Sequence, residues 1–327
     1  MTAAEILEAL PRKSALVIGD ICLDRWCTYD PAAAEPSRET GIPRTGVVRT
    51  VVTPGAGGTV ANNLAALGAG RVAVLGLVAD DGFGYELRQA LAARGIDGGL
   101  LVAAPGRQTF TYTKLLNAST GEEDQPRIDF INTEDVPEEV EEILLARVRQ
   151  AWPSFDVVLV SDQSETERGG VVTARVRALI GELAAAAPDK VVLVDSRLRP
   201  EHFRGVILKP NQREADEACR RLFGAVDYRR FREHVAAPLL LVTHGPAGVL
   251  LLRDGCPDEW VPTRAVENPV DICGAGDSFS AGMAMALAVT GDAARAAAFG
   301  NLVASITIMK KGTGTASPAE LLARAGA

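Results

Sequence analysis

The sequence predicts an α/β protein with a mostly parallel central sheet and helices on both of its faces. Short apolar, β-branched runs alternate along the chain with longer helical patterns, and this alternation favours parallel strands that are buried on both sides. Apolar residues make up 47% of the chain and charged residues 23%, which is typical of a soluble globular protein with a full core. A length of 327 residues fits one large α/β domain or two ordinary ones.

The expected strands are short runs that consist almost wholly of Val, Leu, Ile and Ala. The expected helices lie between them and carry apolar residues at the spacing of a helical face. The strands are predicted at residues 15–19, 72–78, 157–160, 191–194, 206–208 and 239–243, and the helices at 60–67, 84–93, 137–150, 171–186 and 214–223.

The last third of the chain has a different pattern. A turn over residues 242–248 separates two apolar runs, the second at 249–252. From Gly274 onward we expect helices over 281–289 and 293–309, with Ala-rich faces that suit close packing. Ligands of a parallel sheet tend to bind at the carboxyl ends of its strands.

Two stretches break the alternation, at residues 25–53 and 108–130. The first is rich in Pro, Thr and Arg, and the second holds a strand-like TFTYTKLL, a polar loop and RIDF. Together they could form a small β lid over a site, and two surface loops are the alternative. We expect residues 1–327 to form one domain that carries this lid.

The charge and cysteine content exclude several classes of protein. A formal net charge of −8 disfavours binding to nucleic acid or to an anionic membrane. The five cysteines are scattered without C-x-x-C spacing and only three His are present, so a zinc site or a disulfide framework is not expected. The start of the chain lacks signal-peptide features and no long apolar run occurs, so we expect a cytoplasmic protein.

The strongest motif is D-I-C-G-A-G-D at residues 271–277, which leads into an apolar helix. At a helix start, the small residues Gly274, Ala275 and Gly276 leave bare backbone N–H groups that favour an anion. Asp277 stands at the same place, where a carboxylate would only repel a bound phosphate. It makes sense as a base that takes a proton from an attacking hydroxyl while the amides hold a transferring phosphoryl group. An ordinary helix-capping Asp is the alternative.

Two other glycine motifs are absent. A P-loop requires G-x-x-x-x-G-K-[ST], and a dinucleotide fingerprint requires G-x-G-x-x-G after the first strand. Neither pattern occurs in the chain. A dehydrogenase is therefore disfavoured.

The chain resembles the ribokinase, or PfkB, family of carbohydrate kinases. The D-x-x-G-A-G-D signature at 271–277 is very specific to this family, and the order and spacing of further motifs hold over about 14–322. Within the family, the segment GDICLDRW and residues 109–114 and 127–130 look most similar to the D-glycero-β-D-manno-heptose-7-phosphate kinase branch. The further motifs are Gly19-Asp20 with Asp24, the glycine-rich segment 54–68, Lys209–Glu214, Thr243–Gly248 and Lys311–Thr313.

This resemblance implies a Rossmann-like ribokinase fold with a β lid and an ATP-dependent transfer to a sugar hydroxyl. It implies that Asp277 is the catalytic base and that Gly274, Ala275 and Gly276 stabilise the phosphoryl charge. ATP and Mg²⁺ would be the cofactors, with K⁺ or Na⁺ as a monovalent cation in some members. The implied nucleotide residues are Asn211, Thr243, Gly245, Gly248 and Asn301, and the implied metal residues are Glu214, Asp271 and Gly312.

The resemblance also implies a sugar site. Asp24, Gly55, Gly57 and Thr59 would contact the sugar, and Lys114 and Arg127 could meet a substrate phosphate under the lid or could face solvent. Most family members have Asn where this chain has Thr59, so the sugar contact there must differ. They have Thr where this chain has Cys273, which is also small, so catalysis need not suffer. Heptose kinases follow a Ser-Asp pair closely with Lys, whereas here Ser161-Asp162 leads into a longer, acidic segment in which Arg168 could replace it.

The expected function is therefore that of a sugar or sugar-phosphate kinase. A nucleoside kinase of the same fold and a non-catalytic sugar-phosphate sensor are the alternatives. Because a lid with exposed strand edges tends to pair with another subunit, we expect a homodimer formed through the lid.

Overall fold

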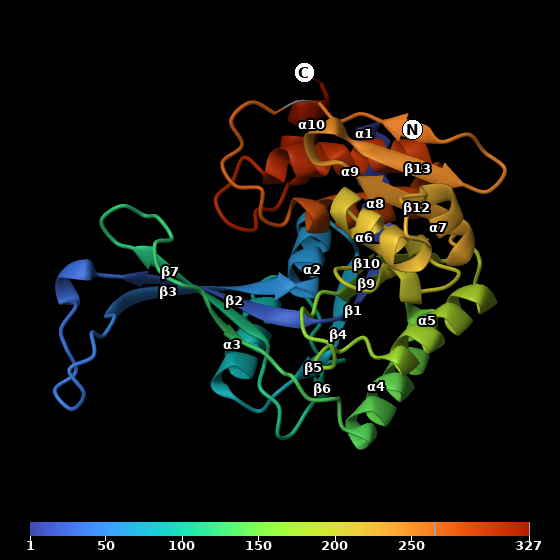
Figure 1. Ribbon diagram of the computed structural model, residues 1–327. Helices are drawn as coiled ribbons and strands as arrows, with labels where there is room; N and C mark the ends of the chain where they lie inside the picture. The colour runs from blue at the N-terminus through green and yellow to red at the C-terminus, as the bar shows by residue number, and fades with distance from the viewer. Residues whose placement is uncertain (265, 327) are drawn as a thin grey trace.

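The computed structural model describes residues 1–264 and 266–326 and contains a main sheet flanked by helices (Figure 1). The strand order of this sheet is β14-β13-β12-β11-β10-β9-β1-β4. Neighbours from β12 to β4 run parallel, and β13 and β14 are antiparallel additions at one edge. The bounds are β1 Ser14–Gly19, β4 Arg71–Leu75, β9 Val157–Asp162, β10 Val191–Ser196, β11 Ile207–Leu208, β12 Leu239–Thr243, β13 Val249–Arg253 and β14 Glu259–Val261.

The central strands are apolar throughout because both of their faces are buried. In β1, Ala15 and Val17 pack into one core, whereas Leu16 and Ile18 pack into the other. Successive side chains of a strand point to opposite faces, so a strand between two helical layers needs an unbroken apolar run. The predicted mostly parallel α/β architecture is therefore confirmed.

Each core is closed by its own set of helices. One face is covered by α1 Ala3–Ala9, α2 Gly57–Ala66, α3 Gly82–Ala92, α8 Ala275–Thr290, α9 Ala293–Thr307 and α10 Pro318–Ala325. The other is covered by α4 Glu138–Ala151, α5 Ala174–Ala186, α6 Gln212–Phe223 and α7 Tyr228–His234. No helix in the described part of the chain is long and apolar enough to span a membrane.

A second sheet, called here the outer sheet, extends away from the main body (Figure 1). Its order is β3-β2-β7-β8, so it combines strands from the two stretches that break the alternation. Strands β2 and β7 run parallel, and β3 and β8 are the antiparallel edges. The bounds are β2 Ile21–Tyr29, β3 Val47–Ala56, β7 Thr111–Asn117 and β8 Ile128–Phe130.

Two expected elements differ from the structure. The single strand expected at 72–78 is interrupted at Gly76, where a Cβ atom would lie 2.4 Å from the Gly19 carbonyl oxygen. The chain then forms β5 Leu77–Val78, which pairs with β6 Val102–Ala103. The helix expected from residue 171 begins at Ala174, because the Thr173 side chain caps it by accepting from the Val176 amide.

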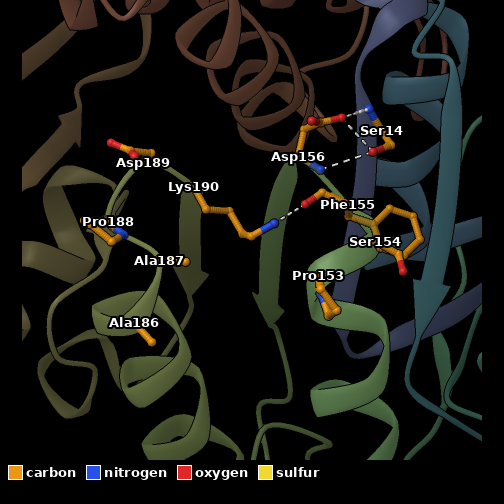
Figure 2. Close-up of a pocket in the computed structure, with 10 residues that line it drawn as sticks. All are labelled: Ser14, Pro153, Ser154, Phe155, Asp156, Ala186, Ala187, Pro188, Asp189 and Lys190. Atoms are coloured by element: carbon orange, nitrogen blue, oxygen red, sulfur yellow. Dashed lines mark hydrogen bonds between the residues drawn. The ribbon is translucent and has the colours of Figure 1, made fainter.

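The two ends of the parallel strands differ in character. Where β1, β9 and β10 begin, Ser14 donates from its amide and hydroxyl to Asp156, at 2.8 and 2.7 Å, and Lys190 donates to the Phe155 carbonyl (Figure 2). These bonds tie strand starts together beside a shallow pocket. The carboxyl ends carry the groups that matter for chemistry, namely Asp20, Asp162, Asp195, Lys209 and Thr243.

Candidate active site

The D-I-C-G-A-G-D motif forms the start of α8, as its glycines require. Gly274 is the N-cap with φ of 77°, and Ala275 and Gly276 begin the helix. The first amides of a helix have no acceptor within it, and the helix dipole makes this end positive. Asp277 lies in the first turn and is partly buried. The start of α8 can therefore hold an anion beside a carboxylate.

Asp277 has the electrostatic environment of a general base. Burial raises its pKa to about 7, and repulsion from Asp195 adds to the rise, while the attraction of Lys209 opposes it. A carboxylate with a pKa near the working pH combines a large ionised fraction with good basicity. An Asp that only caps a helix would not require a raised pKa.

Lys209 and Asp195 form a buried ion pair next to this base. The Lys209 Nζ lies 2.9 Å from Asp195 Oδ2, and the side chain of Lys209 is 4% exposed. The same Nζ lies 3.7 Å from the point where a Cβ on Gly276 would stand. A fixed positive charge therefore faces the start of α8. Lys209 belongs to the motif at 209–214, but the sequence analysis assigned no role to Lys209 itself. It did not identify Asp195 at all.

Asn211 and Glu214 lie at the start of α6 and cap it reciprocally. The Asn211 side chain accepts from the Glu214 amide at 3.0 Å, and Glu214 Oε2 accepts from the Asn211 amide at 2.8 Å. Burial raises the pKa of Glu214, and repulsion from Asp195 adds to this. The three carboxylates Asp195, Glu214 and Asp277 outnumber Lys209 and Arg197, the cations that act on them, so this corner of the site favours an added cation.

Four of the five residues predicted to contact the nucleotide line one pocket, and Asn211 does not line it. Thr243, Gly245, Gly248 and Asn301 line it together with Ala275 and Gly276. Asn301 is held by its side-chain amide, which donates to the carbonyls of Val261 and Pro262 at 3.4 and 3.3 Å. The pocket runs directly to the start of α8.

Asp24 lies on β2 with two cations nearby. A Cβ on Gly55 would stand 2.3 Å from Asp24 Oδ1, so the carboxylate requires a bare backbone at position 55. Burial raises the pKa of Asp24 to about 6, and the positive charges of Lys114 and Arg127 oppose the rise. Lys114 lies 4.6 Å above the Trp26 ring.

Arg127 and Lys114 are both partnered by acidic side chains. Arg127 lies 2.6 Å from Asp129, and Lys114 lies 3.6 Å from Glu123. These pairs are at least partly open to solvent, so an anionic ligand can compete for the cations.

Thr59 and Gly57 are buried at the start of α2. The Thr59 hydroxyl donates to the Pro54 carbonyl at 3.4 Å, and its methyl carbon lies 3.3 Å from the Cβ position of Gly274. The Gly57 amide donates to the Asp20 carbonyl at 2.9 Å. Thr59 thus packs against the start of α8 and Gly57 against the chain after β1, and their contact with a sugar stays a prediction.

Asp271 connects the catalytic motif to the closing segment. Its Oδ2 accepts from the Gly312 amide at 3.0 Å, and its Oδ1 accepts from the Cys273 amide at 2.9 Å. In the described residues no group of three or more His, Cys, Asp or Glu side chains could by itself hold a metal ion. A cation here would depend on backbone oxygens as well as on Asp271.

The raised pKa of Asp277 predicts a pH dependence of activity. The base must be ionised to accept a proton, so kcat/KM should fall about tenfold per pH unit below about 7 and level off above it. Steady-state rates between pH 5.5 and 9, with a pH-independent coupling assay, measure this. A profile that is flat down to pH 5.5 would contradict the assignment of Asp277 as the base.

Comparisons with known proteins show the family to which the chain belongs. The model of the pfkB family carbohydrate kinases matches residues 13–320. The Bifunctional protein HldE of Caulobacter vibrioides is 33% identical over 98% of this chain, and that of Trichlorobacter lovleyi is 31% identical over 94%. The chain spans 65% and 62% of the lengths of these two relatives.

Solved structures share the fold at low identity. Ribokinase from Thermotoga maritima superposes with a TM-score of 0.68 and 19% identity, over 96% of this chain and 100% of that one. Phosphofructokinase-2 from Escherichia coli, in complex with potassium, gives a TM-score of 0.71 with 18% identity, over 96% of this chain and 98% of that one. The predicted ribokinase-like fold is confirmed.

Proposed function

This chain belongs to the pfkB family of carbohydrate kinases, and we propose that it transfers the terminal phosphoryl group of ATP to a hydroxyl of a phosphorylated sugar, of the heptose 7-phosphate class. The observation that carries the reaction is the position of Asp277, a carboxylate with a raised pKa beside the free amides of α8. A group that takes a proton next to a group that holds an anion is what phosphoryl transfer to a hydroxyl requires.

In the proposed reaction the acceptor hydroxyl lies between Asp277 and the start of α8. Its oxygen forms a bond to the terminal phosphorus, its proton passes to Asp277, and the bond from that phosphorus to the bridging oxygen of ADP breaks. The amides of Gly276 and Asp277 and the charge of Lys209 stabilise the phosphoryl oxygens. Because the transition state is loose, most of the rate acceleration comes from the positioning of the reactants and from electrostatic stabilisation.

The chain's own residues fit ATP and a cation. Thr243, Gly245, Gly248 and Asn301 would border the nucleotide. Glu214 and Asn211 would hold Mg²⁺, partly through water, where the excess of carboxylates favours positive charge. Mg²⁺ supplies neutralisation of phosphate charge when bound. Asp271 and the 312 region would bind a monovalent cation.

A phosphorylated substrate is favoured by the two cations that face Asp24. The carboxylate can hydrogen-bond sugar hydroxyls, while Lys114 and Arg127 offer positive charge within reach of the same space. A neutral sugar would leave these cations with only their partners Glu123, which is exposed, and Asp129, which is partly buried. A sugar phosphate explains both charges together.

A transfer assay with labelled ATP and Mg²⁺ tests this function. The panel should hold a heptose 7-phosphate, a hexose 6-phosphate, the corresponding free sugars and several nucleosides. We expect kcat/KM to be highest for a sugar phosphate. Highest activity on a nucleoside would support the alternative kinase, and no transfer to any acceptor would support a non-catalytic sensor.

Replacing Lys114 with Met should selectively impair phosphorylated substrates. The loss of one charge-assisted hydrogen bond should lower kcat/KM for the sugar phosphate by about 10- to 100-fold. The rate with the free sugar should change less than about threefold, because the lost contact is with the phosphate alone. Steady-state kinetics with the two matched acceptors measure the difference.

Arg88→Gln serves as the control, since it removes a charge from an exposed position on α3, away from the edge strand β3. It should leave both rates unchanged. Equal losses for sugar and sugar phosphate in Lys114→Met would assign Lys114 to support of the outer sheet and not to the substrate phosphate.

We also propose a cytoplasmic homodimer formed through the outer sheet. Strand β3 is an edge of this sheet, and Val47, Val48 and Val51 on it are exposed. A second copy would cover these side chains and the unpaired strand edge. Light scattering should then give twice 34.4 kDa, and a mass of 34.4 kDa at working concentration would contradict the dimer.

A further inference from the structure

The outer sheet has two faces that carry different side chains. Successive residues of a strand point to opposite faces, whereas residues in register on neighbouring strands share a face. Asp24 is in register with Tyr112, and Trp26 is in register with Lys114. These four side chains therefore lie on one face, called here the polar face. The opposite face holds a small apolar core, formed by Cys27, Tyr29 and Leu115.

The two cations proposed for the substrate phosphate lie next to each other on the polar face. Asp129 of β8 is in register with Tyr112 of β7, so Arg127, two residues before Asp129, belongs to the same face. Continuing this register by two residues sets Arg127 opposite Lys114. Like charges opposite one another on neighbouring strands are destabilising. The polar face is therefore stabilised by an anionic ligand that both cations contact.

Each of these cations lies over an aromatic ring of the same face. The Lys114 Nζ is 4.6 Å from the centre of the Trp26 ring. The guanidinium carbon of Arg127 is 5.0 Å from the centre of the Tyr112 ring. A cation within about 6 Å of a ring centre is attracted by the negative face of the π system. Both cations are thus held by a ring as well as by an acidic partner.

A ring holds a cation without neutralising it. A carboxylate cancels the charge and takes up the N–H donors that a phosphate would need, whereas a ring attracts the cation and leaves both available. The Nζ of Lys114 lies 3.6 Å from Glu123 Oε2, which is longer than a hydrogen bond. Neither the Trp26 ring nor this pair therefore occupies a donor of Lys114. A lysine that is already held in place also loses less conformational freedom when a phosphate binds.

The Trp26 ring also lies against the closing segment beside the catalytic motif. A Cβ on Gly312 would stand 3.4 Å from this ring. The Gly312 amide in turn donates to Asp271 at 3.0 Å. From the same segment, the Lys311 Nζ donates to the Gly121 carbonyl, in the loop between β7 and β8, at 2.8 Å. The polar face is therefore fixed against the chain that leads into the start of α8.

The segment after β9, residues 163–172, places its charge elsewhere. Heptose kinases have a Lys shortly after the Ser-Asp pair, and Arg168 is the one cation of this segment here. The Arg168 guanidinium lies 3.5 Å from Asp135. It lines a pocket with residues of α4 and α5, the helices on the opposite face of the main sheet from α8. Arg168 is therefore directed away from the start of α8.

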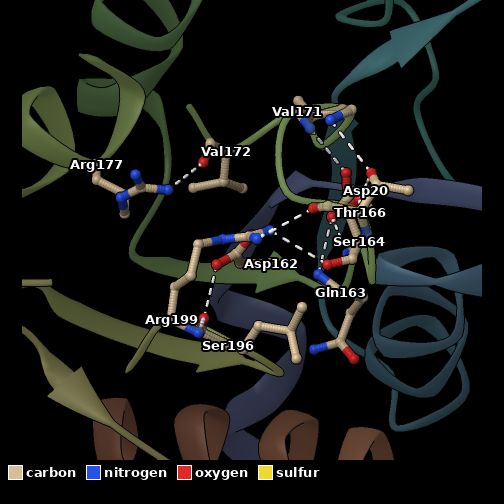
Figure 3. A network of polar contacts seen from close by, with 12 residues as sticks. Asp20, Asp162, Gln163, Ser164, Thr166, Val171, Val172, Arg177, Ser196 and Arg199 are labelled. Carbon is tan, nitrogen blue, oxygen red and sulfur yellow. Dashed lines mark hydrogen bonds and ion pairs between the residues drawn. The ribbon is translucent and has the colours of Figure 1, made fainter. Parts of the chain in front are cut away.

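Buried charges hold this segment in place (Figure 3). Asp20 is 1% exposed and accepts from three amides, those of Gln163, Ser164 and Val171. Arg199 donates to the buried Asp162 and to two carbonyls of the segment, so its donors are occupied. Neither Arg168 nor Arg199 is available to a phosphate beside α8, which strengthens the assignment of that phosphate to the polar face.

We propose that Trp26 and Tyr112 are positioning residues, which hold the two cations of the polar face beside Asp24 without cancelling their charge, so that the site selects a phosphorylated sugar. This inference rests on the proposed function and adds two residues to it. Register places Tyr112 next to Asp24 and Trp26 one step further along the same face, next to Lys114. The hydroxyls of the sugar and its phosphate are thus met at successive positions of one face.

Kinetics with a heptose 7-phosphate and the corresponding free heptose, with labelled ATP and Mg²⁺, test the proposal through the ratio of the two kcat/KM values. Trp26→Leu should lower this ratio about 2- to 30-fold, the range of a cation–π interaction. Trp26→Phe should lower it less, because Phe attracts a cation more weakly than Trp. Tyr112→Leu should also lower the ratio, whereas Tyr112→Phe, which keeps a ring, should leave it nearly unchanged.

A double variant separates positioning of the cation from support of the outer sheet. In the Lys114→Met background, Trp26→Leu should lower the ratio no further, because the cation that Trp26 holds is already absent. Lost packing on Gly312 would reduce the rates with both acceptors alike and leave the ratio unchanged. Tyr85→Leu is the matched control, since it removes an exposed ring of α3 outside the polar face, and it should not change the ratio.

Equal losses with both acceptors in Trp26→Leu would overturn the inference and leave the proposed function intact. A fall of the ratio that persists in the Lys114→Met background would also overturn it. Thermal unfolding shows which variants fold, and if Trp26→Leu does not, the two Tyr112 variants decide in the same way. If the unmodified chain does not prefer the phosphorylated acceptor, the proposed function itself fails, and the inference fails with it.

Discussion

Replacing Asp277 with Asn is expected to lower kcat at least about a hundredfold, in line with the contribution of a general base. Asn keeps the size and the hydrogen-bonding reach of the side chain but cannot accept the proton of the acceptor hydroxyl. Nucleotide affinity should change little, because the nucleotide is held by the pocket and by the amides of α8. Phosphoryl transfer from labelled ATP and calorimetric titration with ADP measure the two quantities.

Asp292→Asn is the matched control for this change. Asp292 caps the next helix, α9, and its side chain accepts from the Arg295 amide at 3.0 Å. It therefore separates loss of the base from loss of any carboxylate at a helix start, because in the second case both variants should have similar small effects on stability and none on rate. A nearly normal rate in Asp277→Asn would remove Asp277 from the mechanism.

The sequence predicted the fold well where one periodicity dominates. The parallel strands are continuous apolar runs because helices cover both faces, so β1, β9, β10 and β12 could be read almost to the residue. The strand expected at 72–78 failed because its interruption depends on the close approach of Gly76 to the Gly19 carbonyl. Such a contact joins distant parts of the fold and leaves only an ordinary glycine in the sequence.

The candidate site was predictable where a motif carries its own geometry. A glycine-rich helix start followed by Asp277 predicts an anion site and a base within four residues. The structure brings Asp271 and Gly312, the two residues named for a monovalent cation, into contact, and their role stays a prediction. The sugar-site roles of Gly57 and Thr59 stay predictions, since both residues are buried at the start of α2.

Charges that act across strands could not be assigned from the sequence. Asp195 and Lys209 look like ordinary polar residues at or just after the end of a strand, and only the sheet order brings β10 and β11 side by side. A weak signal was present, because charged residues follow directly after buried strands at the carboxyl end of a parallel sheet. Which of them pair with one another depends on register.

Replacing Lys209 with Met should destabilise the protein by about 3 kcal/mol or more, the usual effect of removing one partner of a buried ion pair. Lys209 is 3% exposed, and Asp195, Glu214 and Asp277 all act on it. Met retains the length and the packing of the side chain but leaves three carboxylates without their common counter-charge. Urea unfolding measured by circular dichroism gives the change in the free energy of unfolding.

The loss should be larger at pH 8 than at pH 5. The pKa of Asp277 is already raised to about 7, and removal of the Lys209 charge raises it further. A carboxyl group whose pKa is higher in the folded than in the unfolded state destabilises the fold as pH rises above the unfolded value. At pH 5 most of this repulsion is relieved by protonation, so the two pH values separate a lost charge from lost packing.

Asp195→Asn tests whether Lys209 stabilises the protein only through its pair with Asp195 or through all three carboxylates. Alone it should cost less than Lys209→Met, because Lys209 keeps Glu214 and Asp277 as neighbours. Added to Lys209→Met it should restore part of the lost stability, since one of the uncompensated carboxylates is then removed.

Arg44→Met, which breaks the exposed pair with Glu35, provides the control and should cost less than about 1 kcal/mol. If Lys209→Met also cost less than this and independently of pH, Lys209 would not be the counter-charge of the cluster, and the electrostatic balance proposed around Asp277 would be wrong.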